Sequence, residues 1–298
     1  MKRIDIKADY ICNNNCLFCV IGEEERHVKA IPIEEIRREL SDARKQGATD
    51  VALTGGEPTI RREILDLVSY AKQLGYSTIM LITNGRMLSN SDFAGKLVAA
   101  GANRFMFSIH GINEGHDDLT RVPGSYRQAV QGMKNVKALG IEIVTDTVAT
   151  RKNCHELPAI VRHLLQAGAA VCQVDFVIPC GSAWHHKESI IPPMKDVAPY
   201  VHKVIDDAKR AGDDKKILVM GLPYCQMKGY EGYMNEPNIP EIKISAPEAA
   251  HRAEDYNEHR VEGKVKPEKC RMCEHFSRCE GVWENYIQLY GDGELVVK

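Results

Sequence analysis

Three cysteines near the start of the chain lie close enough in sequence to act together. Cys12, Cys16 and Cys19 are separated by three and two residues and follow an apolar stretch. Thiolates at this spacing can bind three irons of a four-iron, four-sulfur cube, which leaves the fourth iron without a protein ligand. The alternatives are a structural zinc site, which usually has four Cys or His ligands, and cysteines with no joint function. We expect the cube, whose open iron can bind a substrate or a cofactor.

The other cysteines form one further group and four isolated positions. The group is Cys270, Cys273 and Cys279, and the isolated ones are Cys154, Cys172, Cys180 and Cys225. No stretch approaches the roughly 18 to 20 apolar residues of a membrane helix, and residues 1–15 lack the apolar core of a secretory signal. We therefore expect a cytoplasmic protein with no membrane partner. Because that compartment keeps thiols reduced, clustered cysteines there bind metal more often than they form disulfides.

The composition is that of an ordinary globular protein. The 298 residues include 39 Lys and Arg against 41 Asp and Glu, so the net charge is −2, and 44% of the residues are hydrophobic. A near-neutral chain without a basic block has no electrostatic footprint for a phosphate backbone, so we expect no nucleic-acid partner. The length allows one large domain with a small appendage.

The elements that must position the cysteines follow a repeating pattern. Up to residue 220, amphipathic helix-like stretches end in a glycine, as helix C-caps often do, and are followed by short apolar runs rich in β-branched residues. This alternation predicts right-handed βαβ units and a parallel sheet. We count six or seven strands rather than eight, which predicts an α/β protein with an open, partial (β/α)6 barrel whose chemistry lies at the C-terminal ends of its strands. The expected strands are residues 3–10, 51–54, 78–82, 105–109, 141–148, 171–178 and 217–220.

The first cysteine group resembles the signature of the radical S-adenosylmethionine (radical SAM) superfamily. That signature is Cys-x3-Cys-x2-Cys after the first barrel strand, with an aromatic residue before the last cysteine, and Phe18 fills that place. The resemblance spans residues 1 to about 215 and implies a SAM-binding [4Fe-4S] cluster. It also implies reductive cleavage of SAM to a 5′-deoxyadenosyl radical, which abstracts a hydrogen atom from a substrate.

Residues at the ends of the expected strands match family positions that bind SAM. Gly55, Gly56, Glu57 and Pro58 correspond to the segment that receives the amino group of SAM, where glycines allow close approach and oxygen atoms suit an ammonium. The positions implied to contact the SAM ribose or carboxylate are Thr83, Asn84, Ser108 and His110, with Thr147, Thr150 and Arg151 as weaker candidates. The alternative roles for these residues are a tight turn and polar caps of loops.

The second cysteine group resembles the central part of the SPASM and twitch extensions of radical SAM enzymes. Trp283 stands where a full SPASM domain has its next cysteine, so the resemblance implies one auxiliary [4Fe-4S] cluster, with Cys225 as the fourth ligand. The predicted domains are a barrel of residues 1–215 and a small, Cys-rich, twitch-like module of residues 216–298. Zinc is the alternative, because Cys-x2-Cys is a common zinc spacing and His275 is nearby.

A loop after the sixth expected strand carries residues that could act on a substrate. Cys180 could donate a hydrogen atom to a substrate radical, or it is a small buried side chain. Trp184, His185 and His186 could line the substrate, or they form a polar surface loop. His116 lies in a further loop, which resembles a loop common among family members with an extra C-terminal cluster domain. We expect His116 to stabilise that loop rather than to act in catalysis.

The leading hypothesis is a radical SAM oxidoreductase or maturase that oxidises or cross-links a peptide or protein side chain. Its implied partner is an electron donor such as flavodoxin or ferredoxin. One alternative is radical oxidation or rearrangement of a small molecule, such as a sugar, a nucleotide or a cofactor precursor. A non-catalytic iron–sulfur carrier and a zinc-stabilised interaction protein are further alternatives.

Overall fold

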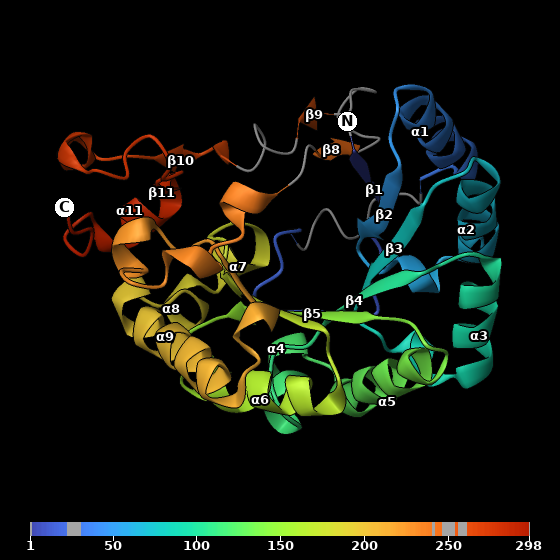
Figure 1. Ribbon diagram of the computed structural model, residues 1–298, viewed down its shortest axis with the longest axis horizontal. Coiled ribbons are helices and arrows are strands. Elements are labelled where there is room, and N and C mark those ends of the chain that lie inside the picture. The colour runs from blue at the N-terminus through green and yellow to red at the C-terminus, as the bar shows by residue number, and fades with distance from the viewer. Residues whose placement is uncertain (1, 23–30, 240–241, 246–253, 256–260, 298) are drawn as a thin grey trace.

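The computed structural model describes residues 2–22, 31–239, 242–245, 254–255 and 261–297. Within these ranges no helix is long and apolar enough to cross a membrane. The chain forms one large curved sheet with helices around it and a smaller unit near the C-terminus (Figure 1).

Seven parallel strands form the main sheet in sequence order, as predicted. They are β1 (Arg3–Asp9), β2 (Asp50–Gly55), β3 (Thr78–Thr83), β4 (Arg104–Ser108), β5 (Ile143–Ala149), β6 (Val171–Phe176) and β7 (Ile217–Met220). Six helical connections join them, which confirms the partial (β/α)6 barrel. Successive side chains on each strand face alternately toward the helices and toward the inside of the barrel. On β5, Asp146 and Val148 therefore share the inner face, while Thr147 lies on the other.

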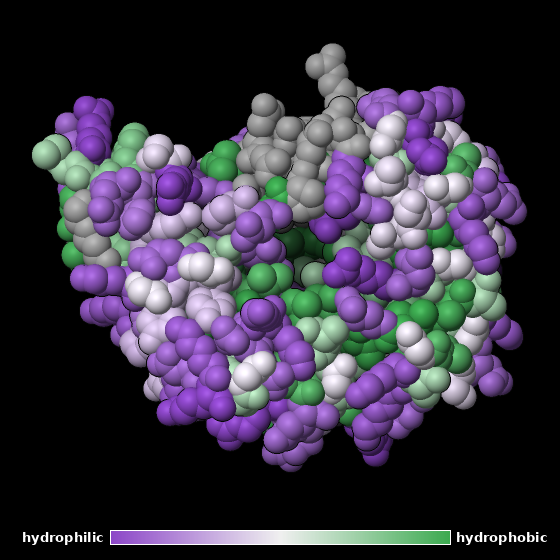
Figure 2. Space-filling model, viewed as in Figure 1, coloured by the Kyte–Doolittle hydropathy of each residue, from purple (hydrophilic) through white to green (hydrophobic). Residues whose placement is uncertain are grey.

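The helices form an outer ring around the strands (Figure 1). They are α1 (Ile33–Lys45), α2 (Ile64–Gln73), α3 (Ser91–Ala100), α4 (Glu114–Thr120), α5 (Ser125–Ala138), α6 (Leu157–Ala167), α7 (Gly181–His185), α8 (Lys187–Ile190) and α9 (Met194–Ala211). Each long helix buries one apolar stripe, such as Ile36, Leu40 and Ala43 on α1. The face seen in Figure 2 is hollowed at the centre of this ring.

The sheet continues beyond residue 215, where we expected the barrel to end. Strand β7 pairs with β6, and β8 (Ile242–Ser245) pairs with β1 at the opposite side of the sheet. A short strand, β9 (Glu254–Asp255), follows antiparallel to β8. Among the described residues β7 and β9 are the two edges of the sheet, so the barrel is open.

The C-terminal unit contains a two-stranded sheet and one helix. Strand β10 (Lys264–Val265) pairs antiparallel with β11 (Val282–Trp283), and α11 (Glu284–Tyr290) follows directly. Tyr286 on α11 is buried, and its ring packs edge-on against Phe176 of β6 at 5.8 Å between ring centroids. Its hydroxyl oxygen accepts a hydrogen bond of 2.7 Å from the backbone N–H of Met194 and donates to Glu294. These contacts fix the C-terminal unit to the barrel.

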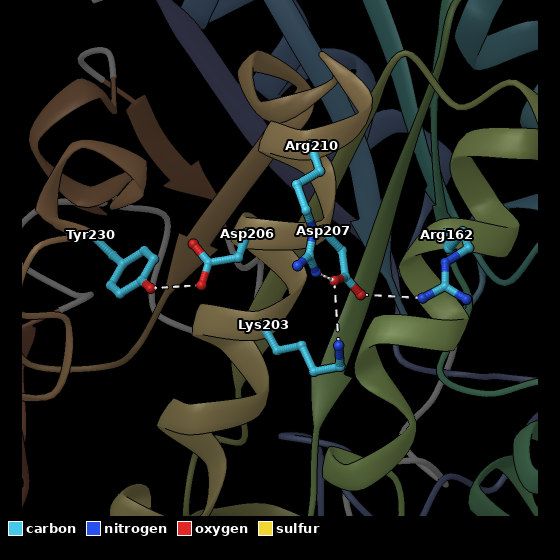
Figure 3. Close-up of polar contacts among 6 residues, drawn as sticks. All are labelled: Arg162, Lys203, Asp206, Asp207, Arg210 and Tyr230. Atoms are coloured by element: carbon cyan, nitrogen blue, oxygen red, sulfur yellow. Dashed lines mark hydrogen bonds and ion pairs between the residues drawn. The ribbon is translucent and has the colours of Figure 1, made fainter.

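Helix α9 makes polar contacts on two of its sides (Figure 3). The carboxylate of Asp207 accepts hydrogen bonds from Arg162 of α6 at 3.1 Å, from Lys203 at 3.3 Å, and from Arg210. The neighbouring Asp206 accepts one of 2.9 Å from the hydroxyl of Tyr230, which lies beyond β7. Helix α9 is therefore held to the barrel on one side and to the segment after β7 on the other.

Replacing Tyr286 with Phe should lower the free energy of unfolding by about 1–3 kcal/mol. The substitution keeps the ring but leaves the N–H of Met194 buried without an acceptor. Urea unfolding followed by circular dichroism measures the change. Tyr200→Phe on α9 is the matched control, since the hydroxyl of Tyr200 makes no hydrogen bond within the described ranges. Equal stability of the two variants would contradict this account.

Candidate active site

The chain that leaves β1 is held against the chain that leaves β2. The N–H of Gly56 donates to the carbonyl of Asp9 at 2.7 Å, and the N–H of Glu57 donates to the carbonyl of Ile11 at 2.9 Å. The backbones lie so close that a Cβ on Gly55 would stand 2.1 Å from the Asp9 carbonyl oxygen, and one on Gly56 would stand 2.2 Å from that of Ile11. Gly55 also has a φ of +118°. Only glycine therefore fits both positions.

The carboxylate of Glu57 is buried and fully engaged by the protein. It accepts hydrogen bonds from the N–H of Thr59 at 3.0 Å, the hydroxyl of Thr59 at 2.5 Å, the hydroxyl of Thr83 at 2.7 Å and the N–H of Asn84 at 2.6 Å. Burial raises the pKa of Glu57, while these donors work against the rise because they stabilise the charged form. Glu57 thus ties the end of β2 to the end of β3.

The cysteine loop, residues 10–22, is held on one side by residues that follow β3. The side-chain amide of Asn84 donates to Asn13 Oδ1 at 2.6 Å and lies 3.9 Å from Cys12 Sγ. Arg86 donates to Asn14 Oδ1 at 2.9 Å and to the carbonyl of Asn13. Arg86 was not predicted as a site residue, although it directly follows Thr83, Asn84 and Gly85 at the end of β3.

The other side of the cysteine loop contacts α4 and α7. The N–H groups of Asn15 and Leu17 each donate at 3.0 Å to backbone carbonyls near the end of α4. The N–H of Ser182 donates to the carbonyl of Cys19 at 2.9 Å, and a Cβ on Gly181 would stand 2.3 Å from the carbonyl oxygen of Val20. Cys180 lies beside the same loop, with its sulfur 3.9 Å from that oxygen. Cys12, Cys16 and Cys19 are all half-buried and none is in a disulfide.

Phe18 of the cysteine loop packs on a pair of buried histidines. Its ring meets that of His110 edge-on at 4.4 Å, and the rings of His110 and His116 are stacked at 5.8 Å. His110 Nδ1 accepts from the N–H of Val148, and His116 Nδ1 accepts from the N–H of His110, both at 3.1 Å. Burial lowers the pKa of both, to about 4 for His116. His116 therefore bonds to the strand end that carries His110.

Several predicted residues do not join this group. The hydroxyl of Thr147 donates to the carbonyl of Ile109 at 2.7 Å on the outer side of β5, and that of Thr150 donates to Asn153 at 2.9 Å. Arg151 is exposed and donates to Tyr290 at 2.7 Å. Trp184 stacks with the ammonium of Lys187 instead of lining the barrel.

A central pocket of about 230 Å³ lies inside the barrel, bordered by the cysteine loop and the C-terminal unit. Residues from both units line it, among them Phe18, Asp146, Asp175, Glu236, Lys264 and Trp283. Ser108, the last residue of β4, is the register partner of Asp146. Asp146 and Asp175 were not predicted as site residues, although an acidic residue in the middle of an apolar parallel strand is unusual.

Four cysteines line a second, mainly apolar pocket in the C-terminal unit. They are Cys225, Cys270, Cys273 and Cys279, and His275 also borders this pocket. Burial raises the pKa of Cys225, and the nearby thiols of Cys279 and Cys270 raise it further. The N–H of Gly281 points at Cys279 Sγ at 3.4 Å. The structure therefore brings Cys225 to the same pocket as the second cysteine group.

Comparison with known proteins identifies the barrel. The family model described as the radical SAM superfamily matches residues 9–163, more than half of the chain. A probable GTP 3′,8-cyclase of Saccharolobus solfataricus is 33% identical over 159 residues, which are 52% of this chain and 50% of that protein. Another, from Sulfurisphaera tokodaii, is 28% identical over 206 residues, 66% and 65% of the two chains. The chain spans about half the length of the first of these curated relatives.

Solved structures resemble the chain over nearly its whole length. SuiB of Streptococcus suis bound to S-adenosylmethionine has a TM-score of 0.70 at 14% identity, covering 99% of this chain and 76% of SuiB. The structure of anSMEcpe with AdoMet and a Cp18Cys peptide has a TM-score of 0.69 at 14% identity, covering 100% and 93%. At such identities the likeness concerns the fold, and it includes the C-terminal unit.

Anaerobically reconstituted protein should contain about eight irons with matching sulfide, because each cube holds four. The double variant Cys225→Ala, Cys270→Ala should keep about four, since only the cysteine loop then binds a cube. Cys172→Ala is the control and should keep about eight, because this buried thiol lies on β6 outside both groups. Iron, sulfide and zinc analysis decides the outcome. About four irons and one zinc in the unaltered protein would assign the C-terminal pocket to zinc.

Proposed function

Because this chain belongs to the radical SAM superfamily, we propose that it cleaves SAM reductively and abstracts a hydrogen atom from a bound substrate. The bound cluster and SAM supply the electron transfer, the C–S bond cleavage and the 5′-deoxyadenosyl radical. The observation that carries the proposal is the cysteine loop, whose three thiols are fixed by β2, β3, α4 and α7 beside the central pocket.

The residues after β2 and β3 would hold the SAM methionine. The carboxylate of Glu57 accepts four hydrogen bonds from the protein itself, so its role is to position residues 55–58. The backbone carbonyls of Gly55 and Gly56 are therefore the oxygens proposed to accept hydrogen bonds from the ammonium of SAM. Asn84 and Ser108 are proposed to contact the SAM carboxylate or ribose. Thr83 acts through Glu57, and Pro58 begins the short helix that Glu57 caps.

Apolar side chains around the central pocket would keep water away from the reaction. Phe18, Val148 and Trp283 line it, and His110 is held neutral by burial against Phe18. A dry pocket limits side reactions of a radical. Thr147 and Arg151 are assigned to the framework, because their side chains bond elsewhere.

We propose that the C-terminal pocket holds the auxiliary [4Fe-4S] cluster of a twitch-like module. With four cysteines it is fully ligated, which suits a role as acceptor of the electron left after hydrogen abstraction. The net reaction is then an oxidation of the substrate, and a flavodoxin or ferredoxin is the proposed donor of the electron for SAM cleavage. Cys180 lies beside the cysteine loop, and a role for it as hydrogen-atom donor is proposed only secondarily.

The proposed substrate is a peptide or protein side chain, which the reaction would oxidise or cross-link. The likeness to the peptide-bound structure over the whole chain supports this proposal. The sequence relatives named as GTP cyclases match about half of this chain and favour a small molecule. Three carboxyl groups in the central pocket disfavour a triphosphate there, because like charges repel at close range.

Replacing Cys16 with Ala should abolish the formation of 5′-deoxyadenosine from SAM. The variant removes one of three ligands that hold the cluster at the cysteine loop. Liquid chromatography of anaerobic, dithionite-reduced reactions measures the product. Cys154→Ala is the control and should keep the activity, since this thiol is buried near α6. If the unaltered, reconstituted protein never forms 5′-deoxyadenosine, the proposed function is wrong.

A further inference from the structure

Two carboxyl groups inside the barrel lack the partners that buried charges require. Asp146 on β5 and Asp175 on β6 face the central pocket from neighbouring strands. The Oδ1 atom of each is buried and has no donor group within hydrogen-bond distance among the described residues. Gln173 donates to the other oxygen of Asp175 at 3.1 Å. An unpaired buried carboxylate is costly, so such a site either holds a proton or awaits a cation.

The surroundings add negative charge instead of balancing it. Glu236 lines the same pocket, and its Oε2 is also buried without a donor, while its Oε1 accepts from the N–H of Gly221 at 2.7 Å. Lys264 is the cation that lines the pocket, but its ammonium is bound to Glu280 at 2.7 Å and lies over the ring of Trp283. Three carboxyl groups therefore share a pocket whose one ammonium is already paired.

Burial raises the pKa of both Asp146 and Asp175, which favours a proton on the pair. Burial raises the pKa of Asp146 to about 7, and burial together with the charge of Asp146 raises that of Asp175 well above its usual value. The two carboxyl groups are within hydrogen-bond reach of each other, so one proton can be shared between them. The pocket is lined mainly by apolar side chains, which favours a cation that carries carbon atoms over a bare metal ion.

We propose that Asp146 and Asp175 bind a positively charged nitrogen group of the substrate, an ammonium or a guanidinium. Such a group brings two or more N–H donors to the two unpartnered oxygens, and the apolar lining by Phe18 and Trp283 accommodates the carbon chain that carries it. The volume of about 230 Å³ lies below the roughly 300–1,000 Å³ of pockets for drug-sized ligands. It suits one long side chain or a small amine.

This inference rests on the proposed function, since it names the substrate group that the same pocket takes. A Lys or Arg side chain of a peptide and a free small amine present the same chemistry. SAM is a third source of an ammonium, but the resemblance places that group at Gly55 and Gly56. The experiment must therefore distinguish these three sources.

The test measures binding to anaerobically reconstituted protein saturated with SAM, using n-butylammonium and the neutral butyramide in calorimetric titrations at pH 8. We expect n-butylammonium to bind at least about tenfold more tightly, because its charged N–H groups can donate hydrogen bonds to the two carboxyl groups. The preference should be lost in Asp146→Asn, Asp175→Asn and kept in Asp92→Asn, which changes a carboxylate on α3. Binding should tighten from pH 6 to pH 8, because Asp146 releases its proton near pH 7 while the amine stays charged.

Several outcomes overturn the proposal. It is wrong if both probes bind equally to the unaltered protein, if the double Asn variant keeps the preference, or if saturating SAM abolishes binding of n-butylammonium by occupying the pair itself. If the double variant does not fold, Asp146→Asn alone replaces it, and a retained preference there counts in the same way.

Two further measurements distinguish a peptide side chain from a free amine as the source of the cation, and this inference from the proposed function. Acetyl-Gly-Lys-Gly-amide against acetyl-Gly-Gln-Gly-amide tests the peptide source, and n-butylammonium tests the free amine. Tighter binding of the Lys peptide than of n-butylammonium assigns the pocket to a peptide side chain. Formation of 5′-deoxyadenosine by the unaltered protein without any cation preference would overturn this inference and leave the proposed function standing.

Discussion

The contact between two backbones at Gly55 and Gly56 is the constraint on which the rest of the site depends. No side chain fits between the end of β2 and the chain that leaves β1, so the start of the cysteine loop has one position relative to the sheet. Glu57 then fixes the end of β3 to the same point through four hydrogen bonds. Asn84 and Arg86, which follow β3, donate hydrogen bonds to the cysteine loop and so hold it against the same strand ends. The cysteines are thus positioned by the framework of three strands.

The charge of the barrel interior is the second organising feature. Parallel strands with helices outside usually carry apolar residues on both faces, yet β5 and β6 each place one carboxyl group inward. The C-terminal unit brings a lysine to the same pocket already paired with Glu280. The interior therefore holds carboxyl groups for which the described residues lining the pocket offer no free cation. Natural proteins keep such uncompensated groups mainly where they act on a ligand.

Local patterns in the sequence predicted the barrel well and the interior poorly. Each strand could be predicted because it leaves a local pattern in the sequence, an apolar run that follows a glycine at the end of a helix. Ile217–Met220 was predicted correctly from this pattern. The cysteine groups were found because ligand spacing is local. Thr147 and Arg151 were predicted to lie at the site because the sequence indicates where a strand ends. It does not indicate toward which side of the sheet a given side chain points, and both side chains bond elsewhere. Asp146 and Asp175 come together only through the pairing of β5 with β6, which sequence spacing does not reveal.

The contact between Ser182 and the carbonyl of Cys19 has a consequence for biosynthesis. A ribosome adds about 5–20 residues per second, so the first cysteine group leaves it roughly ten to thirty seconds before the segment that encloses it. Strand β8, which covers one side of β1, is made later still. During that interval the thiols are present but their enclosure is not. The order of translation therefore separates the appearance of the thiols from the formation of the contacts that hold their loop in place.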